Sequence, residues 1–276
     1  MIKVSHTVPP AFFDWQEKAS QCYLLLAHQL LRKDSVGQQY RKWVKERKPK
    51  LTVLDNGGYE LGSAIADSYV AKLAMELRVD VVTLPDVFLD AKETHKRVDM
   101  FLKEWGDDLK KAGIKLMGVP QGRTKDEYLE SFLRFYNNPS VHIIGLSFLV
   151  VDKCISQFTR EAGVEVNRPY FIRLLQQLHL TKKPIHLLGL GDPIELISYR
   201  GDTFIESCDS SICFQLAMQK KVVSKEGYKR ETFNILDFDV DRRSVDPLVE
   251  ELFFENAYRV NLFAGQGNMF FLRRSE

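Results

Sequence analysis

Short apolar segments alternate with longer amphipathic segments along most of the chain. The apolar segments are rich in Val, Ile and Leu and are only four to seven residues long, which is typical of strands buried on both faces of a parallel sheet. They predict strands at residues 23–28, 51–54, 81–84, 115–119, 141–146, 185–191 and 203–208, with an eighth at 233–236. Helical periodicity and capping residues occupy the intervals, as where Thr124 precedes Glu127.

Seven or eight strand–helix units in about 250 residues favour a (β/α)8 barrel of the TIM type. The alternative is a doubly wound sheet, but no Gly-x-Gly-x-x-Gly sequence follows the first predicted strand. We therefore expect a single barrel domain over residues 1–276. Residues 1–20 are interpreted as an N-terminal extension. Residues 239–276, with a helix from Val245 to Phe263, are interpreted as a helical closure at the C-terminal end.

Composition adds few constraints. Hydrophobic residues make up 45% and charged residues 28%, and the formal net charge is only +2, so no global field indicates a charged partner. The four cysteines show no Cys-x-x-Cys spacing, which argues against a structural zinc site and a disulfide framework and suits a reducing compartment. Because the sequence shows no signal-like segment and no apolar run of about 20 residues, we expect a cytoplasmic protein without a membrane partner.

A basic segment at residues 41–50 is the main charge asymmetry. Its cations outnumber its single acid, Glu46, and they are interleaved with Trp43 and follow Tyr40. One interpretation is a solvated helix face, and the other is a surface that contacts the phosphates of a nucleic acid. The candidate phosphate-binding residues are Arg41, Lys42, Lys45, Arg47 and Lys48.

Four predicted strands end in polar side chains that suit catalysis or base recognition, namely Asp55, Asp86, Gln121 and Asp209. In a (β/α)8 barrel the carboxyl ends of all strands meet at one mouth, so these side chains are expected to converge there. Glycines beside them allow a flat ligand to approach the backbone closely. The pattern therefore predicts an active site at the mouth of the barrel.

The strand ends resemble those of the tRNA-guanine transglycosylases. Asp55-Asn56-Gly57-Gly58-Tyr59-Glu60 is similar to the Asp-Ser-Gly-Gly-Phe-Gln signature of that family. Further similarities, in the same order as in the family, are Val119-Pro120-Gln121-Gly122 to Val-x-Gln-Gly, Ile144-Gly145-Leu146 to Gly-Gly-Leu, Leu187-Leu188-Gly189-Leu190-Gly191 to Leu-Met-Gly-Val-Gly, Asp209-Ser210-Ser211 to Asp-Ser-Ala, and Asn256-Ala257-Tyr258 to Asn-x-Tyr. They extend over about residues 50–262, and the combination indicates the superfamily better than any single motif.

One departure from the family pattern indicates which branch of the family the chain resembles. Family members bind a structural zinc through three closely spaced cysteines and a histidine just before the Asn-x-Tyr, whereas this chain has no cysteine after Cys213 and carries Glu255 in place of the histidine. The zinc-binding subdomain is therefore expected to be missing. A compact, zinc-free member resembles most the deoxypurine-in-DNA transglycosylases of phages and bacteria, which exchange guanine in DNA for a 7-deazaguanine.

The resemblance implies a role for each strand-end residue. Asp209 would attack C1′ of the deoxyribose and form a covalent intermediate, and Asp55 would move protons on the leaving and entering bases. The base would be held by Asp86, Gln121, Gly122, Gly145, Leu146, Tyr59, Leu188, Gly189, Asn56 and Gly57. No cofactor and no metal are implied. The expected partners are DNA, in which the nucleotide must be flipped out, and a base such as 7-cyano-7-deazaguanine. The sequence is compatible with a homodimer and with the use of an accessory protein.

Alternatives remain at the level of function. The chain is also compatible with a minimal tRNA-guanine transglycosylase, with a non-catalytic nucleic-acid-binding subunit of such an enzyme, or with a glycosidase in which water replaces the incoming base.

Simpler structural explanations also exist for single residues. Asp55 and Asp86 are compatible with turn-forming roles, Tyr59 with a core position, and Asp209 with a helix cap. Glu206, three residues before Asp209, is the alternative nucleophile. The histidines in apolar strands, His28, His142 and His186, are expected to be core residues rather than ligands.

Overall fold

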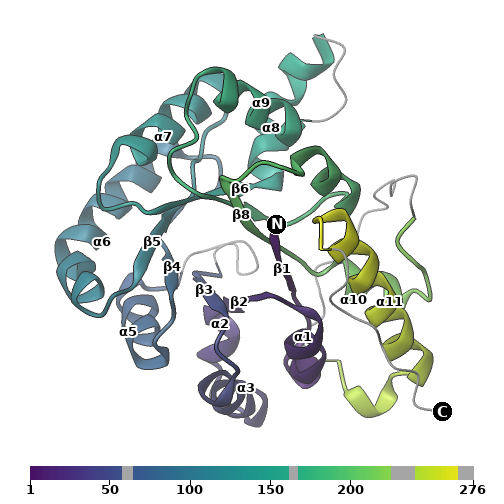
Figure 1. The fold of residues 1–276 in the computed structure, drawn as a ribbon. Coiled ribbons are helices and arrows are strands. Elements are labelled where there is room, and N and C mark those ends of the chain that lie inside the picture. The colour runs from purple at the N-terminus through teal and green to yellow at the C-terminus, as the bar shows by residue number, and fades with distance from the viewer. Residues whose placement is uncertain (58–64, 162–166, 225–239, 267–276) are drawn as a thin grey trace.

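Eight parallel strands curl into a nearly closed barrel with helices around it (Figure 1). This computed structural model describes residues 1–57, 65–161, 167–224 and 240–266. The strand order around the sheet is β1-β8-β7-β6-β5-β4-β3-β2. The strands are β1 (Lys3–His6), β2 (Cys22–Leu26), β3 (Leu51–Asp55), β4 (Val81–Thr83), β5 (Lys115–Gly118), β6 (Ile143–Ser147), β7 (Ile185–Leu188) and β8 (Ile205–Ser210). The predicted (β/α)8 class is confirmed.

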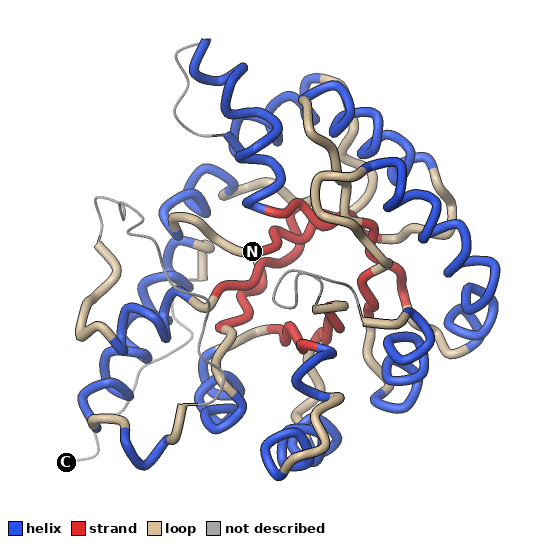
Figure 2. Tube along the Cα trace, turned by 180° about the vertical axis from the view of Figure 1, so that it is seen from behind, coloured by secondary structure: helices blue, strands red, loops and turns tan. Residues whose placement is uncertain are grey.

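The helices form an outer ring around the strands, which is clear from the opposite side in Figure 2. They are α1 (Phe13–Ala19), α2 (Ala27–Leu30), α3 (Ser35–Glu46), α5 (Asp67–Leu77), α6 (Ala91–Lys111), α7 (Lys125–Asn137), α8 (Phe148–Glu161), α9 (Asn167–Gln177), α10 (Ile212–Met218) and α11 (Pro247–Phe263). Short 3-10 helices are η1 (Pro10–Phe12), η2 (Pro193–Tyr199) and η3 (Arg242–Ser244). The predicted capping residue Thr124 does accept a hydrogen bond from the Glu127 amide, at 3.2 Å.

The first strand corrects the prediction for the N-terminal segment. Residues 1–20 were expected to be an extension, but Lys3–His6 is a barrel strand that pairs with β8, and α1 follows it. The segment is not a recognisable apolar run because Lys3 and Ser5 alternate with the buried Val4. The predicted strand at 233–236 lies outside the described residues, and β1 completes the set of eight in its place.

Strands β1 and β2 meet at the seam of the barrel. The sheet ladder is interrupted there, but the Leu24 amide donates to Ser5 Oγ at 2.9 Å and the Gln21 amide donates to the Val4 carbonyl at 2.9 Å. A hydroxyl on β1 therefore takes the place of a backbone acceptor. This bond keeps the barrel wall continuous next to β8, which carries Asp209.

The barrel interior is filled with side chains. A buried cluster separate from the main core consists of Leu24, Leu26, Val53, Val81, Met117 and Ile143, with Leu51 and Leu188 packed against it. Because side chains alternate along a strand, this cluster faces the barrel axis, and the larger core lies between the strands and the helices. These side chains leave the barrel axis occupied below the mouth, where the strand-end residues lie.

The C-terminal helix closes the outside of the barrel beside β1. The predicted helix from Val245 to Phe263 is confirmed as α11, although residues 267–276 are not among those described. Asn261 accepts a hydrogen bond at Oδ1 from His6 Nε2 at 3.0 Å and donates to the Ala19 carbonyl at 3.2 Å. Asn256 is fully buried and accepts the Val223 amide at 2.7 Å. Asn261 therefore attaches α11 to β1 and α1, and Asn256 attaches it to α10 and the segment that follows.

We expect the stability of the protein to fall as the pH drops from about 6.5 towards 4. Burial lowers the pKa of His6 from 6.5 to about 4, despite the opposing hydrogen bond from Asn261. In that pH window the unfolded chain binds a proton that the native state does not, so protonation favours unfolding by on the order of 3 kcal/mol for this group. Urea unfolding at pH 7 and pH 4.5 measures the effect.

The matched variants are His6→Gln, which retains a donor for Asn261, and His179→Asn at an exposed position. The first variant should lose stability at pH 7 yet show a smaller difference between the two pH values than the wild-type protein. The second should follow the wild-type pH dependence. An unchanged pH dependence in His6→Gln would rule out His6 as a major source of acid sensitivity.

Candidate active site

Asp209 lies near the carboxyl end of β8, opposite Ser5 of β1, and its side chain is only 12% exposed. One of its oxygens, Oδ1, accepts the Gly189 amide at 3.1 Å and lies 3.1 Å from His186 Nε2. Among the described residues, none donates a hydrogen bond to the second oxygen, Oδ2. The alternative role as a helix cap is not observed, because Ser210 Oγ accepts the first amide of α10. One oxygen is thus fixed and the other is available for chemistry.

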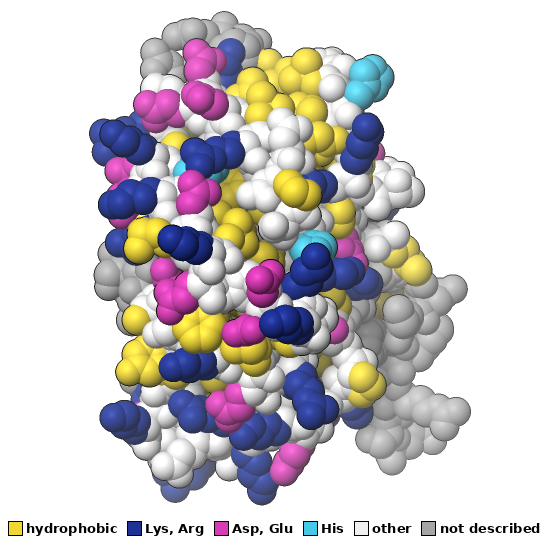
Figure 3. Space-filling model, turned by 90° about the vertical axis from the view of Figure 1, so that its left-hand side faces the viewer, with side chains coloured by type: hydrophobic (Ala, Val, Ile, Leu, Met, Phe, Trp, Pro, Cys, Tyr) yellow, Lys and Arg dark blue, Asp and Glu magenta, His cyan; other side chains and the backbone are white. Residues whose placement is uncertain are grey.

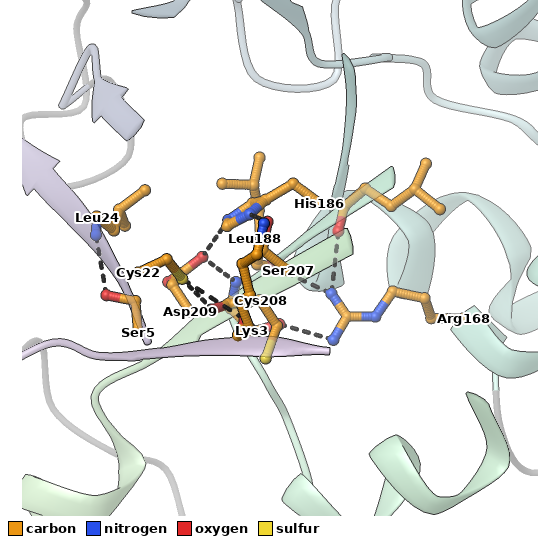
Figure 4. Close-up of polar contacts among 12 residues, drawn as sticks. Lys3, Ser5, Cys22, Leu24, Arg168, His186, Leu188, Ser207, Cys208 and Asp209 are labelled. Atoms are coloured by element: carbon orange, nitrogen blue, oxygen red, sulfur yellow. Dashed lines mark hydrogen bonds and ion pairs between the residues drawn. The ribbon is translucent and has the colours of Figure 1, made fainter. Parts of the chain in front are cut away.

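His186 is a site residue that the sequence assigned to the core. It is buried on β7, but its ring connects two polar residues of β8, with Nδ1 2.7 Å from Ser207 Oγ and Nε2 facing Asp209 (Figure 4). Because a carboxylate only accepts, the Nε2 atom that faces Asp209 must carry a proton, and in that tautomer Nδ1 accepts the Ser207 hydroxyl. The ring therefore orients Asp209. His142, also expected in the core, is exposed.

Asp86, Asn56 and Gln121 form a closed polar cluster above β4 and β5. Asn56 Nδ2 donates to Asp86 Oδ1 at 2.8 Å, and Gln121 Nε2 donates to Asp86 Oδ2 at 2.6 Å. Gln121 Oε1 in turn accepts the Leu89 amide at 3.0 Å. Burial raises the pKa of Asp86, and the two amide hydrogen bonds oppose that shift. Each carboxylate oxygen has a second lone pair, so the cluster can still accept donors from a ligand.

Asp55 is the last residue of β3, and its side chain forms a turn with the residues that follow. Its Oδ2 accepts the Gly57 amide at 2.9 Å, and Gly57 has a φ of +70°, so the predicted alternative of an Asx turn is what this oxygen forms. Its side chain is on the barrel-facing side of the strand, in line with Val53. Strands β1 and β2 lie between β3 and β8, so Asp55 and Asp209 are carried by non-adjacent strands.

Gly145 on β6 is buried, and neighbouring side chains occupy the space that its own side chain would fill. A Cβ atom there would lie 2.7 Å from Leu188 Cδ1 and 3.2 Å from Met117 Sδ, so the glycine faces the barrel axis and a side chain would compete for space with Leu188. Thr83 on β4 shares this inward orientation, and its buried hydroxyl has no hydrogen-bond partner among the described residues. Thr83 was not predicted as a site residue, although its position two residues after the inward-facing Val81 is a usable signal.

Two predicted base-binding residues, Leu146 and Gly122, are packed elsewhere. Leu146 belongs to the core between the strands and the helices, which corrects its predicted contact with a base. Gly122 packs closely against α7, where a Cβ atom would lie 2.6 Å from the Tyr128 amide nitrogen. Tyr59 lies outside the described residues. Gly189 does reach the site, but its amide binds Asp209.

The basic segment is not at the mouth. Arg47 donates to Thr52 Oγ1 at 3.2 Å and to the Leu77 carbonyl at 3.3 Å, so it lies at the amino ends of β3 and β4, opposite the site. Lys45 pairs with Glu76 at 2.9 Å, and Arg41 donates to the Leu30 carbonyl. Among the candidate phosphate-binding residues, only Lys42 and Lys48 are exposed and have no described contact through the side chain.

The aromatic residues of this segment belong to the core. The Tyr40 and Trp43 rings stack on Phe13, with centroids 4.0 and 4.6 Å apart. They are therefore not placed to stack on nucleic-acid bases. On the face of the molecule that includes α6, basic and acidic side chains are interspersed with apolar ones (Figure 3). That face shows no separation of charge by sign.

No protein-family model and no curated protein matches the sequence. A solved structure assigned as a fructose-1,6-biphosphate aldolase from Coccidioides immitis is 12% identical, with a TM-score of 0.51 over 96% of this chain and 89% of that one. An N-acetylneuraminate lyase from Fusobacterium nucleatum is 8% identical, with a TM-score of 0.46 over 95% and 97% of the two chains. An L-ribulose 3-epimerase is 11% identical, with a TM-score of 0.46 over 96% and 95%. At these identities the first similarity supports the barrel fold and nothing finer.

Two features are absent from the part of the chain that the structure describes. No group of three or more His, Cys, Asp or Glu side chains within them is arranged to hold a metal ion. No helix within them has the length and apolar character needed to cross a membrane.

Proposed function

We propose that the protein is a DNA-guanine transglycosylase, which exchanges guanine in DNA for a 7-deazaguanine such as 7-cyano-7-deazaguanine. The observation that carries the proposal is the Asp209 carboxylate, whose Oδ1 is held by the Gly189 amide and His186 while Oδ2 has no described donor. A carboxylate fixed in this way at the mouth of a barrel suits nucleophilic attack on a sugar carbon. The same residue occupies the position that the transglycosylase resemblance assigns to the nucleophile.

In the proposed reaction, a lone pair of Asp209 Oδ2 forms a bond to C1′ of a flipped-out deoxyguanosine. The C1′–N9 bond breaks with its electron pair going to the base, and a proton supplied through Asp55 neutralises the departing guanine. The incoming 7-deazaguanine then attacks C1′ through its ring nitrogen, loses its proton to Asp55, and releases Asp209 as a carboxylate. The two displacements restore the enzyme, and no oxidant or reductant is required.

The polar cluster around Asp86 supports a guanine-like base. Guanine and its 7-deaza analogues present adjacent donors, N1–H and the exocyclic amine, and a carboxylate is the acceptor that matches both. Asn56 and Gln121 fix the orientation of Asp86 by donating to its two oxygens. Adenine lacks the N1–H donor and would leave the half-buried carboxylate unmatched, which is a basis for discrimination. The half-buried Leu188 side chain, which packs over Gly145, provides a surface for the flat ring.

The choice of DNA over tRNA rests on the missing zinc-ligand cysteines of the sequence. To test it, the protein is incubated with duplex DNA and, in parallel, with bulk tRNA, each with 7-cyano-7-deazaguanine, and the nucleosides are analysed by mass spectrometry. We expect the modified deoxynucleoside in DNA. Modification of tRNA alone would contradict the DNA assignment, and release of guanine that does not depend on the added base would indicate a glycosidase. No change in either nucleic acid would contradict base exchange.

A further inference from the structure

A single peptide group connects Asp209 to a buried arginine. The Gly189 amide donates to Asp209 Oδ1 at 3.1 Å, and the carbonyl of the same peptide, that of Leu188, accepts Arg168 Nη1 at 3.1 Å (Figure 4). Arg168 Nη2 also donates to the Gly189 carbonyl at 2.7 Å. Gly189 has a φ of +66°, a conformation that favours glycine, and it directs its amide to Asp209 and its carbonyl to Arg168.

The guanidinium of Arg168 has no unused donor. Its Nε donates to Glu195 Oε2 at 3.1 Å, one Nη2 hydrogen binds Glu195 Oε1, and the second Nη1 hydrogen binds the Leu146 carbonyl at 3.0 Å. The side chains of Arg168 and Glu195 are 1% and 6% exposed. Tyr199 donates its hydroxyl to Glu195 Oε2 at 3.0 Å. All five guanidinium hydrogens are thus directed at acceptors on β6, β7, η2 and the turn after β7.

The charges at the two ends of the Leu188–Gly189 peptide polarise it in the same direction. A cation lies at its carbonyl end and a carboxylate at its amide end, and hydrogen bonds in such a chain strengthen one another, more so where water is excluded. A lysine in place of Arg168 would keep a charge but lose the planar set of five donors. The arginine is therefore matched to this geometry and not only to the charge of Glu195.

We propose that Arg168 is a positioning residue for Asp209, acting through the Leu188–Gly189 peptide to hold Oδ1 and leave Oδ2 turned toward the substrate. Its effect on reaction rate rests on the proposed function, whereas the physical link between Arg168 and Asp209 does not. The competing explanation is that Arg168 is only a structural anchor of α9. An anchor would influence stability without altering how Asp209 is held or the rate of the chemical step.

The link is tested by NMR on protein labelled with 15N-glycine, with the Gly189 signal among the 16 glycines assigned by Gly189→Ala. We expect the Gly189 amide proton to move upfield in both Asp209→Asn and Arg168→Lys. The control is Arg200→Lys, because Arg200 also donates to backbone carbonyls, those of Leu262 and Phe263, but at an exposed site. If Arg168→Lys does not fold, Glu195→Gln disturbs the same guanidinium and must shift the same signal. An unmoved Gly189 signal in the folded variant overturns the proposal.

The rate is tested in the same variants. We expect Arg168→Lys to slow formation of the covalent adduct at least about tenfold with an unchanged KM for the incoming base, because only the nucleophile is affected. An unchanged rate, or a rise in KM alone, would contradict a positioning role. If the wild-type protein forms no adduct with any nucleic acid, the proposed function fails, and the NMR experiment still decides whether Arg168 and Asp209 are linked.

Discussion

Asp209→Asn is expected to abolish the covalent protein–DNA adduct and to lower base exchange by about a thousandfold or more. Asparagine has nearly the same shape and retains an oxygen that can accept the Gly189 amide, so the fold and the neighbouring contacts should persist. Its amide nitrogen cannot serve as the nucleophile. The measurement is the amount of radiolabelled oligonucleotide that stays with the protein on a denaturing gel, together with the rate of 7-cyano-7-deazaguanine incorporation.

The matched control is Glu206→Gln, an equally conservative change on the same strand. Glu206 forms a part-exposed ion pair with Lys3 at 3.1 Å, and both residues lie toward the amino end of the barrel, away from the mouth. We expect this variant to form adduct at the wild-type rate, since a partly exposed ion pair contributes about 1 kcal/mol or less to stability. Adduct retained in Asp209→Asn but lost in Glu206→Gln would assign the nucleophile to Glu206.

The strands that the sequence predicts well are those with continuous apolar runs. β3 and β7 begin at the predicted residues, because buried parallel strands are apolar on both faces. β1 was missed for the opposite reason. It is four residues long, and its barrel-facing positions are Lys3 and Ser5, which make contacts at the seam and with β8 instead of entering an apolar core. A short strand with polar inward residues resembles a loop in the sequence.

The site was only partly predictable because some of its contacts involve backbone atoms. Carboxylates at strand ends are visible in a sequence, and Asp86 and Gln121 do meet on adjacent strands. His186 was not recognised because Ile185 and Leu187 on either side of it are both apolar, so the sequence does not show which face turns inward. The partners of Arg168 are carbonyls of Leu146, Leu188 and Gly189, and a backbone acceptor leaves no signature in the sequence.

Clusters of charged residues in the sequence predicted the site less well than polar residues at the ends of strands did. The basic segment on α3 suggested phosphate binding, yet the two arginines it contributes donate to carbonyls of their own fold. In a sequence, an arginine whose guanidinium binds backbone oxygens looks the same as an arginine that binds a phosphate. Only the neighbours distinguish them, and those neighbours, such as Leu77, are distant in the chain.

Gly145→Val is expected to raise the KM for the incoming base by at least about tenfold while changing the chemical step much less. The proposed base lies against Leu188, which packs over Gly145, and any side chain at position 145 projects toward Leu188 Cδ1, where even a Cβ atom would lie only 2.7 Å away. The new side chain pushes on the end of the Leu188 side chain and not on the Leu188–Gly189 peptide, so the Gly189 amide should keep its bond to Asp209, and the Gly189 NMR signal checks this. Initial rates at increasing 7-cyano-7-deazaguanine concentrations, with DNA saturating, separate KM from kcat.

Two further variants show whether the effect arises from the space above Gly145. Gly106→Ala on α6 is the control, because the nearest atoms to its new Cβ belong to Leu102 at 3.9 Å, an ordinary contact, and its KM should equal that of the wild type. Gly145→Ala combined with Leu188→Ala removes the side chain nearest to the new Cβ; because Leu188 also faces the base, we expect the KM of this double variant to equal that of Leu188→Ala alone, with no added effect of Gly145→Ala. A wild-type KM in a folded Gly145→Val protein would show that the base does not bind against Leu188, and the recognition role proposed for this residue would then have to be abandoned.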